Sequence, residues 1–138
     1  MRIEKGFISY GHDVDTEVTP VMAGLEFTLD RQSDFIGKQA LQSAPAPVKR
    51  LVTIILDDVN AVPLGNEPVM KEDRIVGKTT SAAFGYRVGQ PVSLAVLDCA
   101  CCVDGQSISV DIAGVYFDGQ VKCGPAYDPS GARMRLTT

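Results

Sequence analysis

The chain has 138 residues, of which 45% are apolar and 22% charged, and its 13 Lys and Arg against 17 Asp and Glu give a net charge of −4. This length fits one ordinary domain, or one domain plus a fragment of another, and the composition excludes a disordered polyelectrolyte. The acidic balance argues against a nucleic-acid partner, and the longest apolar run, Leu51–Leu56, is far too short to span a bilayer. Because the N-terminus lacks the apolar core of a secretion signal, no membrane partner and a reducing, cytoplasmic setting are expected.

The first residues are strand-like over Met1–Lys5, which places Glu4 between Ile3 and Lys5. Carboxylates are depleted in strands, and burying an unpaired charge is costly. If this face is buried, Glu4 therefore needs a partner, such as a ligand that offers paired N–H donors. The alternative is a surface carboxylate bridged to Arg2 or Lys5.

A turn at Gly11–Asp13 carries the single histidine, His12. A neighbouring carboxylate could orient it as a general base, but no nucleophile stands beside it, which favours a local hydrogen-bonding role. A short helix is predicted near residues 36–43, ending at the two prolines of Ala44–Pro47. Residues 1–47 are too short and too poor in strands to form a domain, so they are expected to be a short α+β remnant of a larger one.

From residue 48 onward, Gly and Pro recur between short runs rich in Val and Ile, a pattern typical of an antiparallel sandwich or barrel. Ser107–Ile112 alternates polar and apolar residues, so Ile108, Val110 and Ile112 should share one face. The expected fold is mainly β, with a six-stranded antiparallel Greek-key or jelly-roll barrel over residues 48–138. Its predicted strands are Lys49–Leu56, Pro68–Lys71, Ile75–Ser81, Val92–Asp98, Ser107–Ala113 and Val115–Cys123.

The glycine-bearing segment Thr79–Gly89 fits neither phosphate-binding glycine pattern and is predicted to be a loop between two strands. Its side chains Phe84, Tyr86 and Arg87 could present a flat aromatic and a cation to a planar ligand. The alternative is a wide hairpin connection whose aromatic side chains cover the end of the barrel, and the composition favours this alternative.

Four cysteines, Cys99, Cys101, Cys102 and Cys123, form the most conspicuous cluster of reactive side chains. Only Cys99 and Cys102 have the C-x2-C spacing of a zinc site, and a second pair of ligands is missing because Cys123 stands alone. The expectation is therefore no metal site, and incidental thiols near the end of a strand.

Short motifs occur in a particular order and spacing over nearly the whole chain. None of them is diagnostic alone, but so many in register make chance similarity improbable. They are Arg2-Ile-Glu-Lys-Gly6, Tyr10-Gly-His-Asp13, Thr19-Pro20, Ala23-Gly-Leu25, Asp34-Phe-Ile-Gly37, Ala40-Leu41, Val62-Pro-Leu-Gly65, Glu67-Pro-Val69, Val76-Gly77, Thr80-Ser81, Tyr127-Asp-Pro129, Gly131 and Arg133-Met-Arg135.

Together these motifs resemble the C-terminal part of the glycine-cleavage T-protein (aminomethyltransferase) family, and in particular the folate-binding C-terminal regions of dimethylglycine and sarcosine dehydrogenases. The resemblance implies that residues 1–47 end a folate-binding domain and that residues 48–138 form its C-terminal barrel. It further implies tetrahydrofolate as the cofactor, with Glu4 accepting two side-by-side hydrogen bonds from the pterin.

The resemblance also implies further contacts with the cofactor. Arg31 is the nearest match to a basic residue that approaches the folate, and Phe84 and Tyr86 belong to the family's aromatic loop. Ala82 and Ala83 replace the usual glycines there, and Tyr86 stands where the dehydrogenase-like members tend to carry histidine. The family's catalytic aspartate lies in an N-terminal portion that this sequence does not contain, so no catalytic residue is expected.

Three functions follow as hypotheses. The first is a truncated or split tetrahydrofolate-dependent aminomethyltransferase-like protein that contributes part of a folate site and is inactive alone. The second is a non-catalytic barrel module for protein association, with degenerate folate-binding residues. In both, the partner is a second copy or a second chain that supplies the N-terminal domains, because the remnant must bury its apolar face. The third is a thiol-based metal or redox protein using Cys99 and Cys102, which requires bound zinc or a depressed thiol pKa.

Overall fold

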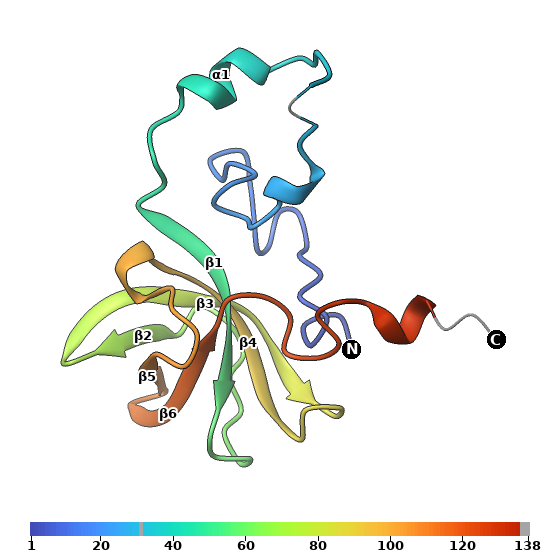
Figure 1. The fold of residues 1–138 in the computed structure, drawn as a ribbon. Helices are drawn as coiled ribbons and strands as arrows, with labels where there is room; N and C mark the ends of the chain where they lie inside the picture. The colour runs from blue at the N-terminus through green and yellow to red at the C-terminus, as the bar shows by residue number, and fades with distance from the viewer. Residues whose placement is uncertain (31, 136–138) are drawn as a thin grey trace.

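Six antiparallel strands close into a barrel in the computed structural model, which describes residues 1–30 and 32–135 (Figure 1). The strand order around the barrel is β1-β4-β3-β2-β5-β6. Strands β2, β3 and β4 are consecutive neighbours and β1 returns beside β4, which is a Greek key. The strands are β1 (Lys49–Leu56), β2 (Pro68–Lys71), β3 (Arg74–Gly85), β4 (Gln90–Asp98), β5 (Ser107–Ile112) and β6 (Val115–Lys122).

The predicted mainly-β fold is confirmed, and all six predicted strands are present. The bounds of β1 and β2 agree with the prediction residue for residue. In β5 the side chains of Ile108 and Val110 are buried in the barrel while Ser107 is exposed, as the alternation predicted. The local pattern was sufficient to predict β5 because the side chains on one face of this strand are more deeply buried than those on the other.

The segment 79–89 differs from its prediction as a loop. Strand β3 continues to Gly85, and only residues 86–89 form the turn that leads into β4. The register pairs Ala82 with Ser93 and Phe84 with Pro91, so the antiparallel ladder extends through the small and aromatic residues. Pairing with β4 outweighs the turn-like composition, because tertiary context overrides strand propensity.

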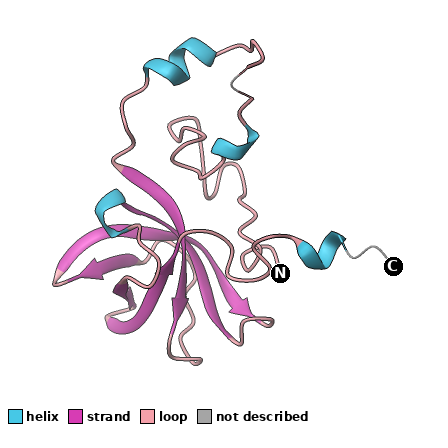
Figure 2. Cartoon of the chain, viewed as in Figure 1, coloured by secondary structure: helices cyan, strands magenta, loops and turns pink. Residues whose placement is uncertain are grey.

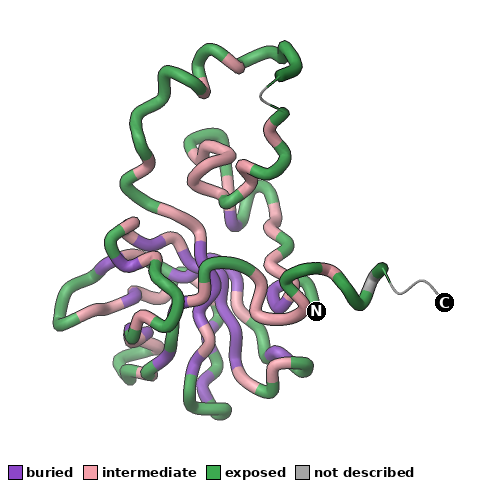
Figure 3. The backbone as a smooth tube through the Cα atoms, in the orientation of Figure 1, coloured by how far each residue is buried: buried purple, intermediate pink, exposed green. Residues whose placement is uncertain are grey.

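The core has two parts, one on each face of β4. Inside the barrel, Ala95 and Leu97 pack with side chains from each of the other five strands. Outside, Val92 and Leu94 pack against Ile3. Strand β4 is therefore buried on both faces, and the N-terminal segment covers the outer one (Figure 3). This packing holds the first residues of the chain against the barrel.

The N-terminal segment has little regular structure (Figure 2). The prediction of a strand over Met1–Lys5 is wrong, because these residues form successive turns in which Gly6 N donates to Ile3 O at 2.9 Å. A closed barrel leaves no free strand edge with which they could pair. Helix α1 (Lys38–Ser43) begins two residues later than expected, after Gly37, whose φ is 90°.

Three single-turn helices complete the description, and they are η1 (Glu26–Thr28), η2 (Cys99–Cys101) and η3 (Ala132–Arg135). Among the described residues, none of the helices has the length and apolar character needed to cross a membrane.

Candidate functional site

Glu4 lies in the N-terminal turn with its side chain only 3% exposed. Its Oε1 accepts hydrogen bonds from the backbone N–H groups of Arg87 (2.6 Å) and Val88 (3.2 Å) in the β3–β4 turn. Its Oε2 faces the amino group of Met1 at 3.5 Å. Neither Arg2 nor Lys5 holds this carboxylate, because Arg2 pairs with Asp13 and Lys5 pairs with Asp128. The buried carboxylate thus has one oxygen committed to the turn and one without a hydrogen bond among the described residues.

Aromatic side chains surround this turn. Phe84 and Tyr86 meet edge to face with their ring centroids 5.3 Å apart, and Tyr86 is 83% exposed. The guanidinium of Arg87 lies 5.9 Å from the centre of the Tyr127 ring, within range of a cation–π contact. The structure therefore brings Glu4, Phe84 and Tyr86 together at one end of the barrel. Arg31, the fourth predicted folate-binding residue, lies outside the described residues.

Tyr127 is a neighbour of this cluster that the sequence analysis did not assign to the site. Its backbone N–H donates to the carbonyl oxygen of Glu4 at 2.9 Å, and the next residue, Asp128, pairs with Lys5 at 3.0 Å. The signal that could have found it is the Tyr127-Asp-Pro129 motif, but nothing local connects that motif to residues so far away in the chain. The C-terminal segment thus contacts Glu4 as well, in addition to the β3–β4 turn.

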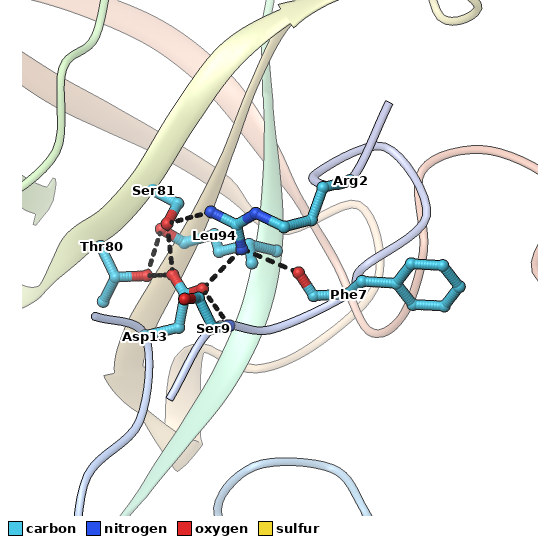
Figure 4. A network of polar contacts seen from close by, with 7 residues as sticks. All are labelled: Arg2, Phe7, Ser9, Asp13, Thr80, Ser81 and Leu94. Carbon is cyan, nitrogen blue, oxygen red and sulfur yellow. Dashed lines mark hydrogen bonds and ion pairs between the residues drawn. The ribbon is translucent and has the colours of Figure 1, made fainter. Parts of the chain in front are cut away.

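A second polar cluster holds the N-terminal segment to β3 (Figure 4). The Asp13 side chain is fully buried and accepts hydrogen bonds from the hydroxyls of Thr80 and Ser81, both at 2.6 Å, and from Ser9 N at 2.8 Å. Arg2 Nη1 lies 2.7 Å from the same carboxylate, and Arg2 Nη2 donates to Ser81 Oγ at 2.8 Å. Four of these five contacts reach the Asp13 carboxylate, which makes Asp13 the anchor of this interface.

Two opposing influences set the ionisation of Asp13. Burial acts to raise its pKa, but the hydrogen bonds from Ser81, Thr80, Ser9 and Arg2 together outweigh burial. The pKa of Asp13 therefore lies below its ordinary value of 3.8, and the group is ionised at neutral pH. Because its carboxylate points to β3, Asp13 does not orient the exposed His12 as a base, so the pair lacks the geometry of a catalytic dyad.

The four cysteines are all free thiols. Within the described part of the chain, no group of three or more His, Cys, Asp or Glu is placed to hold a metal ion. Burial is the main reason that the pKa of Cys102 rises to about 11, and burial also raises the pKa of Cys123. A nucleophilic thiolate requires the opposite shift, so these thiols do not have the electrostatics of a catalytic cysteine.

Comparison with known proteins supports the resemblance. A family model described as "Glycine cleavage T-protein C-terminal barrel domain" matches residues 49–128. The chain is 35% identical over 139 residues to a 4-methylaminobutanoate oxidase (formaldehyde-forming) of Paenarthrobacter nicotinovorans, covering 98% of this chain and 17% of the oxidase. It is 32% identical over 142 residues to mouse mitochondrial dimethylglycine dehydrogenase, covering 99% of this chain and 16% of that protein.

Shorter relatives and a solved structure agree. The aminomethyltransferase of Streptomyces avermitilis is 33% identical over 135 residues, which are 92% of this chain and 36% of that enzyme. The crystal structure of the glycine cleavage system aminomethyltransferase T from Bartonella henselae superimposes with a TM-score of 0.80 at 22% identity, covering 93% of this chain and 37% of that one. This last likeness shows the fold alone.

The matched lengths define what this chain corresponds to. It spans about a sixth of the oxidase and of the dehydrogenase, and about a third of the aminomethyltransferase. The family model covers β1 to β6 and ends at Asp128, beside the Glu4 cluster. Because more than half of the chain matches that model and the observed barrel has the expected strands, the chain belongs to the family of glycine cleavage T-protein C-terminal barrel domains.

Proposed function

We propose that this chain contributes part of a tetrahydrofolate site for one-carbon transfer, in the manner of an aminomethyltransferase, and that polypeptide outside these residues supplies the rest. The observation that carries the proposal is the state of Glu4. A buried carboxylate with one oxygen that faces an amino group at 3.5 Å but accepts no hydrogen bond from the described residues is suited to accept one from a ligand N–H. The names of the aminomethyltransferase relatives support the reaction class.

The surroundings of Glu4 fit a flat, hydrogen-bonding ring system. The β3–β4 turn fixes Oε1, so the carboxylate is held in one orientation before any ligand arrives. The group that faces Oε2 at 3.5 Å is the amino group of Met1, a residue that is 90% exposed. Phe84 and Tyr86 offer aromatic surface nearby. In this proposal Glu4 binds the pterin, the two aromatic residues contact its faces, and the folate carries the one-carbon unit.

Glu4→Gln tests the proposal with little change of shape. The glutamine Oε1 can still accept from Arg87 N and Val88 N, whereas its Nε2 would donate where the wild-type Oε2 accepts. We expect the Kd for tetrahydrofolate to rise roughly 10- to 150-fold, the equivalent of one charged hydrogen bond. The measurement is calorimetric titration of the chain alone and of the chain joined to the remaining part of an aminomethyltransferase.

The matched control is Glu17→Gln, because Glu17 is an exposed carboxylate of the same N-terminal segment. It should leave the titration unchanged. If the wild type and Glu4→Gln bind equally well, or if neither binds in either form of the protein, the folate role of Glu4 is wrong. The association-module hypothesis would then replace it.

The same proposal includes a macromolecular partner. Helices α1 and η1 contain no buried residue, Ile36 is fully exposed and Phe27 is 84% exposed. A six-residue helix is not stable by itself, so α1 needs a surface to pack on. A cavity of about 290 Å³ under α1 is lined by the apolar side chains of Val21, Leu29, Phe35 and Leu41, together with Glu26, Asp30, Lys38 and Gln42. The occupant that we propose is polypeptide equivalent to the remaining two-thirds of an aminomethyltransferase.

Ile36→Asp should abolish that docking, whereas Val115→Asp, an equally drastic change at an exposed position of β6, should not. Co-purification with the unmatched part of the Streptomyces avermitilis enzyme measures the effect, and hydrogen exchange of residues 38–43 reports on α1. We expect rapid exchange in the chain alone and slowed exchange in the complex. A homodimer broken by Ile36→Asp would show that a second copy is the occupant, and slow exchange in a monomer would show that α1 needs no partner.

A further inference from the structure

Two of the cysteines, 21 positions apart in the sequence, lie side by side in the fold. The Cys123 thiol donates to the carbonyl oxygen of Cys102 at 3.2 Å. Both residues line one cavity of about 310 Å³ between the barrel and the N-terminal segment, together with Ile8, Arg50 and Leu51. Cys123 is exposed and Cys102 is half-buried, so a dissolved reagent reaches Cys123 more readily than Cys102.

The hydrogen bond brings the Cys123 sulfur close to the backbone of Cys102. From the 3.2 Å contact and the standard C=O and Cα–C bond lengths, the Cys123 sulfur lies within roughly 6 Å of the Cys102 Cα. The Cys102 thiol currently points back toward β4, where it contacts Asp98 O at 3.4 Å. Disulfide formation therefore requires both side chains to rotate about χ1 until the sulfurs meet, and each thiol to give up its present hydrogen bond to a carbonyl oxygen.

We propose that Cys102 and Cys123 form a thiol modification site that a small disulfide of the glutathione type oxidises to an intramolecular disulfide. In the first step the Cys123 sulfur attacks the small disulfide, which forms a mixed disulfide and releases one thiol. In the second step the Cys102 sulfur attacks the Cys123 sulfur and expels the other half as a second thiol. Both cysteines lose a proton and are oxidised, and the small disulfide is reduced to two thiols.

The other two cysteines are poorly placed for this exchange. Cys101 is buried in the barrel core, out of reach of a dissolved disulfide. Cys99 directs its thiol at Pro47 O, 3.1 Å away on the entry side of β1. It lies in the same single turn as Cys102, where a bridge would have to close a tight ring.

The environment sets the pH at which the exchange runs. Burial and the neighbouring thiols raise the pKa of Cys102, and burial and Asp104 raise that of Cys123. Since the thiolate is the attacking species, the reaction should be slow at pH 7 and faster at pH 9. The titratable and charged groups around the two thiols are Cys99, Cys101, Arg50, Asp104 and Lys122, together with Glu26, which lines the same cavity and pairs with Arg50.

The disulfide would limit the movement of the segment that follows strand β6. Gly124 O accepts from the Thr53 hydroxyl at 2.7 Å, and three residues later Tyr127 N donates to Glu4 O. Covalent attachment of Cys123 to Cys102, the residue after η2, would therefore restrict the chain between β6 and the Glu4 cluster. The inference stands on the contacts of the two thiols and does not depend on the proposed folate function.

The test uses the reduced chain incubated with oxidised glutathione at pH 9. We expect the loss of two of the four free thiols, an intact mass lower by two hydrogens and no retained glutathione. Trypsin separates Val88–Lys122, which holds Cys99, Cys101 and Cys102, from Cys123–Arg133, so the bridge links these two peptides. The oxidised chain should also melt several degrees higher, because the bridge closes a loop around the β5–β6 hairpin.

Two serine variants identify the pair. Cys102→Ser should stop at a stable glutathione adduct on Cys123, whereas the matched control Cys99→Ser should form the bridge like the wild type. A disulfide within the Val88–Lys122 peptide, a Cys123-linked dimer, a stable adduct on the wild type, or no reaction at pH 9 would each overturn the proposal.

Discussion

Replacing Asp13 with alanine is expected to lower the free energy of unfolding by about 2–4 kcal/mol, because a buried donor left without its acceptor costs about 1–3 kcal/mol. The substitution leaves the hydroxyls of Thr80 and Ser81 without their acceptor and removes the charge that holds Arg2. The loss of a hydrogen-bond acceptor by a buried donor lowers the free energy of unfolding. Urea unfolding followed by circular dichroism measures the change.

The pH dependence of stability gives a second readout of Asp13. Its pKa in the folded chain is below the ordinary value of 3.8, so its contribution is fully present above that value and is lost as the pH falls through the lower, folded pKa. The wild type should therefore lose stability in acid more steeply than Asp13→Ala. Asp34→Ala, at an exposed position, should match the wild type in both measurements. Equal acid profiles for the wild type and Asp13→Ala would contradict the anchoring role.

Gly77→Ala is expected to destabilise the barrel by about 3 kcal/mol or more, at or above the upper end for overpacking. A Cβ at this position would lie 2.1 Å from Val96 O and 2.9 Å from the Cα of Leu97. These are backbone atoms of the paired strand β4, so relief requires separating β3 from β4 rather than rotating a side chain. The midpoint of urea unfolding measures the effect.

Gly114→Ala is the control that separates a steric clash from the general loss of glycine. Gly114 has φ of +86° with open space around it, so alanine there meets backbone strain alone. That strain is worth about 1–2 kcal/mol. If Gly77→Ala is no more destabilising than Gly114→Ala, the close approach of β3 and β4 at this point is not as the structure describes.

The sequence predicted the barrel well because its strands are specified locally. Strand β1 is mostly apolar and β5 alternates, and Gly, Pro or Asp stands within two residues of the ends of both strands. Residues such as Ile108 and Val110 therefore indicate a buried face without reference to any other strand. The exceptions are the ends of β3 and the first five residues. Their conformation depends on whether a partner strand is present, and β4 supplies one for Phe84 while nothing supplies one for Ile3.

The candidate site was predicted in part. Glu4, Phe84 and Tyr86 were identified through motif resemblance, and the structure places them at one end of the barrel. Tyr127 was missed, because its contact with Glu4 joins opposite ends of the chain. A sequence motif shows which type of residue occupies a position, but it does not show which distant backbone group will form a hydrogen bond with that residue.

The strands, the barrel and the family could be predicted from the amino-acid sequence, because alternation, turn residues and motif order are properties of short segments. The pairing of the buried polar groups could not be predicted in this way, because it depends on contacts between distant parts of the chain. Asp13 reaches Thr80 and Ser81 across more than sixty residues, Glu4 reaches the turn at Arg87, and Cys123 comes to lie against Cys102. These contacts form where closing the barrel brings distant residues together, and a buried charge must be satisfied by whatever donors that closure places beside it.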